Sequence, residues 1–230
     1  MASIQRLTTK LISQLNSKPT ASLIFLHGSG DTGDGIKQWI TFTMGEFSFP
    51  HIRVIFPTAP SRPYTPNGGY PSTVWFDRQD ISPSVAEHRD TLDPMCDLLG
   101  DIVQSEVQSG IPRERIVIGG FSMGAAMALH LAYRHFREVA GVIALSGFLN
   151  DNSAVYEVLK ERGGRVPPLL QCHGQMDPLV KYSWGKETFR QLQSYGVRGE
   201  FESFPNLYHD LNEKELNIMK KTILTWLPES

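Results

Sequence analysis

The feature that most constrains the fold is a set of short apolar runs that alternate with segments of helical spacing. The runs are continuous, which is typical of strands buried on both faces of a parallel sheet. They cover residues 22–26, 52–56, 116–118, 139–145 and 169–172, with a weaker sixth run at 200–204. Helical spacing is found between them, including residues 85–107, 123–133, 183–195 and 216–227. This alternation predicts an α/β fold with a mostly parallel central sheet and helices on both faces.

The length of the chain predicts a single domain over residues 1–230. A chain of 230 residues with 40% hydrophobic and 20% charged residues suits one globular core. Gly196 and Pro228 are placed to end helices, and Asn212 with Glu215 three residues later marks a helix start. Residues 6–15 leave two alternatives open, an added edge strand or a loose arm.

Charge and targeting signals exclude several classes of partner. The 22 Lys and Arg against 24 Asp and Glu give a formal net charge of −2, with no run of like charges for nucleic acid or an anionic membrane. The N-terminal residues lack the apolar segment of a signal peptide, and neither a membrane span nor a lipidation motif occurs. We expect a cytoplasmic protein with no nucleic-acid partner and at most transient membrane contact.

A nucleophile motif follows one of the predicted strands. Residues 120–124 read G-x-S-x-G, with the β-branched run 116–118 before them and the helix-favouring run 125–129 after them. This strand, turn and helix setting is that of a nucleophile elbow, in which glycines permit a sharp turn and a close approach of strand to helix. The motif predicts that Ser122 is the nucleophile of a serine hydrolase with an α/β-hydrolase fold.

A serine nucleophile needs a histidine base and an acid that orients it, and in this fold the chain order is Ser, acid, His. Asp177 follows the strand run 169–172 in a loop, where the edge of a parallel sheet opens to ligands. The only histidine after Asp177 is His209, in a loop that follows the last strand run. We therefore expect a catalytic triad of Ser122, Asp177 and His209.

The oxyanion formed by such a nucleophile needs two backbone N–H donors. One is expected from Met123, the residue after the nucleophile, and the other from the glycine-rich loop 27–33 that follows the first strand run. His27 is interpreted as a histidine that braces this loop. The loop does not match a nucleotide-binding pattern, and Cys96 and Cys172 have no metal-site or redox spacing, so neither cofactor nor metal is predicted.

The segment 57–80 is rich in Pro and Gly and has no periodicity. Its embedded aromatic residues favour an ordered loop that lines the site over a flexible linker. Only residues 148–167 separate two neighbouring strand runs, which leaves room for one helix and no cap domain. We therefore expect a shallow, open site edged by this segment.

With these residues in hand, the chain resembles the acyl-protein thioesterase and lysophospholipase family, and is most similar to its lysophospholipase-like branch. The motifs that carry the resemblance span nearly the whole chain and lie at residues 25–33, 75–77, 119–124, 172–180 and 208–209. The resemblance implies a small cytosolic α/β-hydrolase, with the triad on Ser122, Asp177 and His209 and the oxyanion amides on Ser29 and Met123.

Two departures from that family concern acyl preference. Thioesterase members of the family commonly carry Gln after the nucleophile and a larger apolar residue at the first oxyanion position, where this chain has Met123 and Ser29. Backbone amides perform the oxyanion role, so the departures spare it. Acyl-chain preference is not carried over.

Three hypotheses about function follow. The leading one is hydrolysis of an acylated protein, of the palmitoyl-protein hydrolase type. The second is a short-chain carboxylesterase or lysophospholipase that acts on a small acyl ester with the same residues. The third, of another class, is a catalytically silent acyl-binding module, which the intact triad disfavours.

Overall fold

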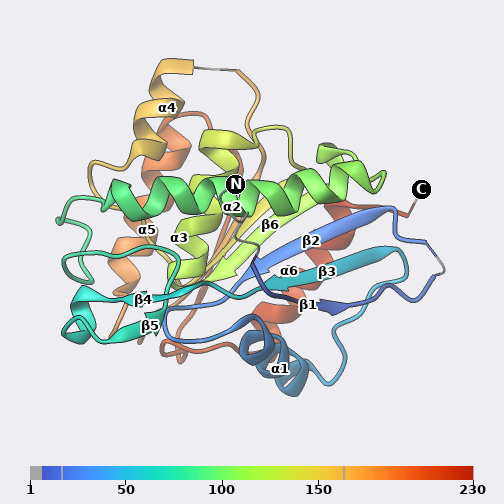
Figure 1. Ribbon diagram of the computed structural model, residues 1–230, viewed down its shortest axis with the longest axis horizontal. Coiled ribbons are helices and arrows are strands. Elements are labelled where there is room, and N and C mark those ends of the chain that lie inside the picture. Colours follow the sequence, from blue (N-terminus) through green and yellow to red (C-terminus); the bar gives the residue numbers. More distant parts are fainter. Residues whose placement is uncertain (1–6, 17, 163, 230) are drawn as a thin grey trace, which may run out of the picture.

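The computed structural model describes residues 7–16, 18–162 and 164–229. Within these residues seven strands form the main sheet, in the order β1-β3-β2-β6-β7-β8-β9 (Figure 1). They are β1 (Thr9–Ile12), β2 (Ala21–Leu26), β3 (Ile52–Pro57), β6 (Ile116–Phe121), β7 (Gly141–Leu145), β8 (Leu169–Gly174) and β9 (Gly199–Phe204). Neighbouring strands are parallel except β1, which is antiparallel to β3. The predicted α/β class is confirmed.

Each apolar run of the sequence lies in one of these strands or overlaps it, including the weaker run at 200–204, which forms β9. The N-terminal alternatives are also decided for the described part of that segment. Thr9 lies opposite Pro57 and Ile12 opposite Val54, so residues 9–12 are an added edge strand. Arg6, the first residue of the segment, lies outside the described residues.

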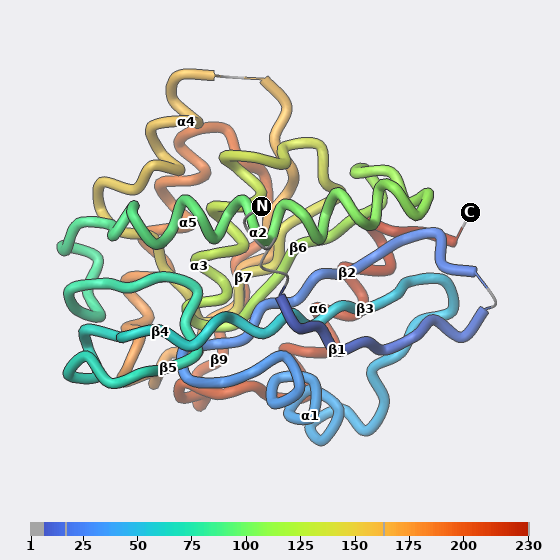
Figure 2. The backbone as a smooth tube through the Cα atoms, in the orientation of Figure 1, coloured from blue at the N-terminus to red at the C-terminus, as the bar shows by residue number. Residues whose placement is uncertain are grey.

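Helices cover both faces of the sheet, as Figure 1 and the backbone trace in Figure 2 show. They are α1 (Gly33–Met44), α2 (Arg89–Gln108), α3 (Met123–His130), α4 (Ala154–Arg162), α5 (Tyr182–Ser194) and α6 (Glu213–Trp226). A π-helical turn, η3 (Leu131–His135), continues α3. Between β7 and β8 the described residues form one helix, α4, and no cap domain. No helix in the described part of the chain is long and apolar enough to cross a membrane.

Two helices differ from the prediction. The segment predicted to be helical from residue 85 becomes helical only at Arg89. The backbone of Glu87 forms an isolated β-bridge with the backbone of Arg78, and its side chain accepts a hydrogen bond from the N–H of Ala154 at 3.0 Å, so Glu87 lies outside the helix. Helix α1 is an addition to the predicted elements. It begins at Gly33, where the Thr32 side chain caps the N–H of Gly35.

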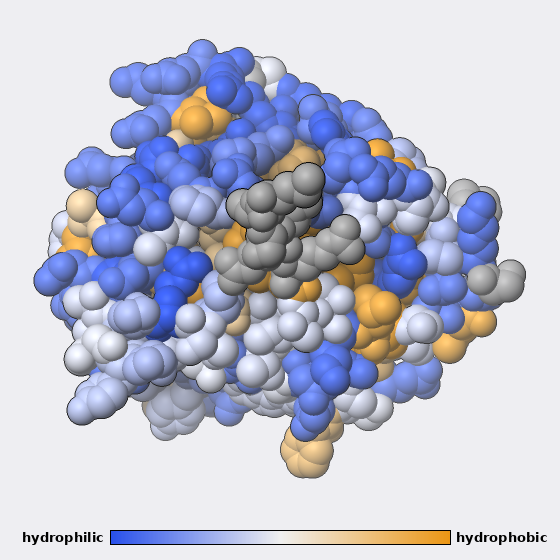
Figure 3. Space-filling model, in the orientation of Figure 1, coloured by the Kyte–Doolittle hydropathy of each residue, from blue (hydrophilic) through white to orange (hydrophobic). Residues whose placement is uncertain are grey.

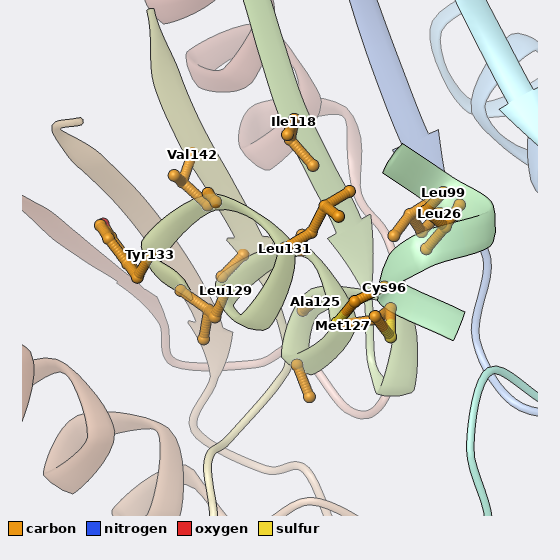
Figure 4. Packing of buried hydrophobic residues seen from close by; sticks show 14 of the residues in the cluster. Leu26, Cys96, Leu99, Ile118, Ala125, Met127, Leu129, Leu131, Tyr133 and Val142 are labelled. Atoms are coloured by element: carbon orange, nitrogen blue, oxygen red, sulfur yellow. The ribbon is translucent and has the colours of Figure 1, made fainter. Parts of the chain in front are cut away.

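Alternation of side chains along the strands divides the core between the two faces. On one face, side chains of β2, β6 and β7 such as Leu26, Ile118 and Val142 pack against α2, α3 and η3 (Figure 4). On the other face, side chains such as Phe25 and Val117 pack against α1 and α6. Every residue of β6 is buried, so the end of this strand is held from both sides. The face of the molecule seen in Figure 3 is largely hydrophilic, with apolar side chains in small groups.

A buried carboxyl group in the first turn of α6 makes stability depend on pH. Glu215 is fully buried, and both of its carboxyl oxygens lack a hydrogen-bond partner. Burial is the main cause that raises its pKa to about 8, and the charge of Asp210 adds to the increase, while the backbone of Asn212 opposes it. The folded state therefore keeps a proton that the unfolded chain releases, and stability is lost as pH rises from about 4.5 toward 8.

Replacement of this carboxyl group should remove that pH dependence. At pH 7 the raised pKa of Glu215 lowers the free energy of unfolding by about 3 kcal/mol. We expect the free energy of unfolding of Glu215→Gln, relative to wild type, to increase steadily between pH 5 and pH 8. Urea denaturation at several pH values measures it. Identical pH slopes for the two proteins would contradict a buried neutral carboxyl group.

Candidate active site

Three polar side chains meet at the carboxyl edge of the sheet. Ser122 directly follows β6, Asp177 lies three residues after β8, and His209 lies five residues after β9. His209 Nδ1 donates a hydrogen bond to Asp177 Oδ2 at 2.7 Å, and its Nε2 lies 3.0 Å from Ser122 Oγ. Residues separated by up to 87 positions thus form one hydrogen-bonded chain. The order acid, imidazole, hydroxyl is the order that activates a serine.

The carboxylate of Asp177 accepts hydrogen bonds from more than one donor. The Asp177 side chain is buried, and its Oδ1 accepts hydrogen bonds from the backbone N–H groups of Leu179 at 2.9 Å and Val180 at 2.8 Å. Its Oδ2 is thereby left for His209. Both oxygens of Asp177 therefore act only as acceptors, which fixes the carboxylate in one orientation.

A second histidine, His173, lies close to Asp177 but takes no part in the series of hydrogen bonds from Asp177 to Ser122. His173 Nε2 is 3.6 Å from Asp177 Oδ2, but it donates its hydrogen bond to the carbonyl of Val180 at 2.8 Å. Burial is the main cause that lowers the pKa of His173, so its ring is neutral at pH 7. His173 supports the loop that carries Asp177 and does not compete with His209.

The backbone at Ser122 is strained in the way that a nucleophile elbow requires. Ser122 has φ 56°, a left-handed value that is unusual for a residue with a side chain. A Cβ at Gly120 would lie 2.4 Å from the carbonyl carbon of Gly124, and one at Gly124 would lie 2.3 Å from the carbonyl oxygen of Leu26. The two flanking glycines are therefore required by the close approach of α3 to β6 and β2.

The glycine-rich loop after β2 is fixed next to Ser122. His27 is buried, donates from Nδ1 to the Gly28 carbonyl at 2.6 Å and accepts at Nε2 from the N–H of Ala59 at 3.0 Å. The N–H of Gly30 donates to the Thr73 carbonyl at 2.9 Å. His27 thus braces the loop, and the loop is tied to the segment 57–80. Ser29 from this loop and Met123 from the start of α3 line the same cavity as Ser122.

Comparison with known proteins places the chain in a family. The model of the phospholipase/carboxylesterase family matches residues 7–227. The chain belongs to that family. Mouse lysophospholipase-like protein 1 is 53% identical over 210 residues, with 91% of this chain and 88% of the relative covered. Acyl-protein thioesterase 1 homolog 1 of Dictyostelium discoideum is 36% identical, with coverage of 91% and 92%.

A solved structure shows the same fold. The crystal structure of Zea mays acyl-protein thioesterase 2 has a TM-score of 0.78 and 27% sequence identity, and covers 96% of this chain and 99% of its own. The chain therefore has the α/β-hydrolase fold of its phospholipase/carboxylesterase relatives, with no cap domain among the described residues.

The cavity at Ser122 is small for a phospholipase/carboxylesterase family member that would bury a lipid chain. Its volume is about 10 Å³, room for about one water molecule. A larger hollow of about 470 Å³ lies between β1 and α2, away from Ser122. The segment 57–80 is ordered, carries the hairpin of β4 (Ser61–Pro63) and β5 (Pro71–Thr73), and contributes Tyr64 and Arg78 to the smaller cavity.

The sequence pattern does not identify Tyr64, Arg78 and Phe148 as lining residues of this cavity. They come from segments without periodicity, and only the packing of the fold brings them beside Ser122. Trp75 is buried and donates from Nε1 to the His27 carbonyl at 2.8 Å, so it packs against the loop beside Ser122. In the described ranges no group of three or more His, Cys, Asp and Glu side chains is arranged to hold a metal ion.

Proposed function

We propose that this chain is a serine hydrolase that cleaves acyl thioesters or esters, with acylated proteins as its leading substrate class. The observation that carries the proposal is the chain of hydrogen bonds from Asp177 through His209 to Ser122, at 2.7 and 3.0 Å. The strained elbow at Ser122 and the family supply independent support. The mouse and Dictyostelium relatives are named as a lysophospholipase-like protein and an acyl-protein thioesterase.

The mechanism follows from the positions of these atoms. Ser122 Oγ attacks the acyl carbonyl while His209 Nε2 takes its proton, and Asp177 stabilises the imidazolium and fixes the ring. Backbone N–H groups of Ser29 and Met123 bind the oxyanion, where loss of one donor typically costs on the order of 10²-fold in rate. His209 then protonates the leaving thiol or alcohol. It next activates a water molecule that hydrolyses the acyl-enzyme.

A second candidate function is favoured by the size of the cavity. About 10 Å³ beside Ser122 gives no room for a long acyl chain within the protein. This favours a short-chain carboxylesterase on small acyl esters over a lysophospholipase. A protein thioester with a short acyl group remains compatible with the site, because the protein part would lie outside the cavity with the leaving group, whereas a palmitoyl chain exceeds the cavity.

An acyl-length series separates these candidates. We expect soluble 4-nitrophenyl esters with four acyl carbons to be hydrolysed with a kcat/KM about tenfold or more above esters with sixteen, because each extra methylene lacks a pocket. An S-acylated peptide should be cleaved faster than lysophosphatidylcholine. Faster cleavage of the sixteen-carbon ester would refute the shallow site, and faster cleavage of lysophosphatidylcholine would favour the lysophospholipase.

We further propose that the protein works in the cytoplasm as a single domain. Cys96 and Cys172 are buried and unbonded, which suits a reducing compartment. Burial raises the pKa of both thiols, so neither is a second nucleophile near pH 7. The catalytically silent alternative is disfavoured, because every side chain of the triad is in hydrogen-bonding position.

A further inference from the structure

A buried arginine lines the cavity that contains the nucleophile. Arg78 is 7% exposed and lies with Ser122, Ser29 and Met123 around the same small space. The proposed mechanism gives this cation no role. Buried charges are usually paired, because their removal from water is costly. The position of Arg78 beside the reacting atoms therefore needs a reason.

Within the ranges that the structure describes, Arg78 lacks the carboxylate partner that Arg53 and Arg134 have. Arg134 has a similarly buried side chain and contacts Asp93 at 2.8 Å, and the less buried Arg53 contacts Glu106 at 2.8 Å. Among the described residues no carboxylate lies within 4.0 Å of Arg78, and its Nε has no hydrogen-bond partner. A guanidinium with free N–H donors is thus kept next to Ser122.

The groups around Arg78 hold the cation without using its donors. Its Cζ lies 4.9 Å from the centre of the Phe76 ring and 5.3 Å from that of Phe148, distances at which the ring faces attract a cation. Tyr64, which also lines the cavity, and the carboxylates of Asp77 and Glu87 act on Arg78 only at longer range.

Both of those carboxylates are bound by other groups. Asp77 accepts hydrogen bonds from the N–H and hydroxyl of Thr65 at 2.8 and 2.6 Å. Glu87 Oε2 accepts a hydrogen bond from the N–H of Ala154 at 3.0 Å, and Oε1 lies 3.0 Å from His130 Nε2. They lower the electrostatic cost of a buried cation but leave its hydrogen-bonding edge free for a ligand.

The cavity lies on the acyl side of the reaction. Ser122 and both expected oxyanion donors line it, whereas His209, which must protonate the leaving group, is outside its lining. The remaining direction at the tetrahedral carbon belongs to the acyl chain. Leu179, which also lines the cavity, is 45% exposed, so a rotamer change can widen the space for a short chain.

We propose that Arg78 is a specificity-determining residue that binds the terminal carboxylate of a short dicarboxylic acyl group attached through the bond that Ser122 cleaves. A carboxylate offers two oxygens to the free N–H donors of the guanidinium, a match that a neutral alkyl chain cannot make. The inference rests on the proposed hydrolase function and names the class of acyl group for the same site.

Carbon-matched thioesters test this assignment. The probes are N-acetylcysteamine thioesters of succinic, glutaric and adipic acids, each compared with the neutral butanoyl, pentanoyl or hexanoyl thioester and corrected for spontaneous hydrolysis. For wild type we expect at least one anionic acyl group to have a kcat/KM about 10- to 100-fold above its neutral match. In Arg78→Met this ratio should fall to about one or below.

The ratio within each variant is the readout, because a general loss of activity does not change it. Arg78→Lys should keep part of the preference, since it keeps the charge without the planar donor pair. Arg190→Met, which removes an exposed positive charge on α5, should leave the ratio at the wild-type value.

Four outcomes would overturn the inference. Equal or faster cleavage of the neutral thioesters by wild type would refute the preference for an acyl group with a terminal carboxylate, while leaving the hydrolase proposal intact. An equal preference in wild type and Arg78→Met would show that another group binds it. A gain for pentanoyl coenzyme A over the pentanoyl N-acetylcysteamine thioester that is lost in Arg78→Met would place the cation on the leaving group. Cleavage of no thioester or ester would defeat both proposals.

Discussion

Ser122→Ala should lower kcat for thioester and ester hydrolysis by about 10⁶-fold. The hydroxyl that it removes lies 3.0 Å from His209 Nε2. No acyl-enzyme can form without it, so only the binding of substrate and oxyanion remains. Steady-state hydrolysis of a short-chain thioester measures the loss.

The matched control for Ser122 is Ser146. It directly follows β7, has φ 49°, and its buried hydroxyl has no hydrogen-bond partner. Ser146→Ala therefore removes a hydroxyl from a similarly strained backbone position and should leave kcat within a few-fold of wild type. Retention of more than about one thousandth of the activity in Ser122→Ala would contradict the assignment of the nucleophile.

Asp177→Asn should lower kcat by about 10⁴-fold with little change in structure. The Asp177 carboxylate only accepts hydrogen bonds. Its Oδ1 accepts from the N–H groups of Leu179 and Val180, and its Oδ2 accepts from His209 Nδ1. If the asparagine oxygen takes the place of Oδ1, its NH₂ group donates to His209 Nδ1. The histidine proton is then forced onto Nε2, where the base must accept the proton of Ser122.

The neighbouring Asp210 provides the control for Asp177→Asn. Its carboxylate accepts a hydrogen bond from the N–H of Leu211 at 2.7 Å and does not contact His209 through any described hydrogen bond. Asp210→Asn removes the same charge one residue from His209 and should keep kcat within about tenfold. Similar losses in the two variants would show that charge near the site, and not the tautomer of His209, determines the rate.

The strands along the sequence and the three polar residues of the proposed triad could be predicted, because both depend on local patterns. Continuous apolar runs identify buried parallel strands, and such strands place their following loops at one edge. Ser122, Asp177 and His209 each follow a different strand, so their meeting at 2.7 and 3.0 Å is a consequence of topology.

Helix α1 and the start of α2 could not be predicted because they depend on weak or distant signals. Gly33 and Gly35 have low helix propensity, and Phe42 is 90% exposed, which obscures the apolar stripe of Ile36 and Ile40. Glu87 has the spacing of a helical residue, but its bonds to His130 and Ala154 hold it outside α2.

Arg78 could not be recognised from the sequence either, because its environment depends on residues that are distant in the chain. Arg78 becomes exceptional only through Phe148, which lies 70 positions away, and through carboxylates whose oxygens are bound elsewhere. A charged residue in a loop is ordinarily solvated, and no local motif distinguishes Arg78 from such a residue. Side-chain partners across the fold had to be known before its free donors could be recognised.

A fluorophosphonate probe followed by peptide mass analysis shows directly whether Ser122 is an activated nucleophile. We expect one adduct, on Ser122, in the wild-type protein, and none in Ser122→Ala. Asp177→Asn should label far more slowly, because His209 is then a poor base. A wild-type protein that stays unlabelled, or that carries the adduct on Ser146 or another residue, would contradict the assignment of Ser122 as the nucleophile.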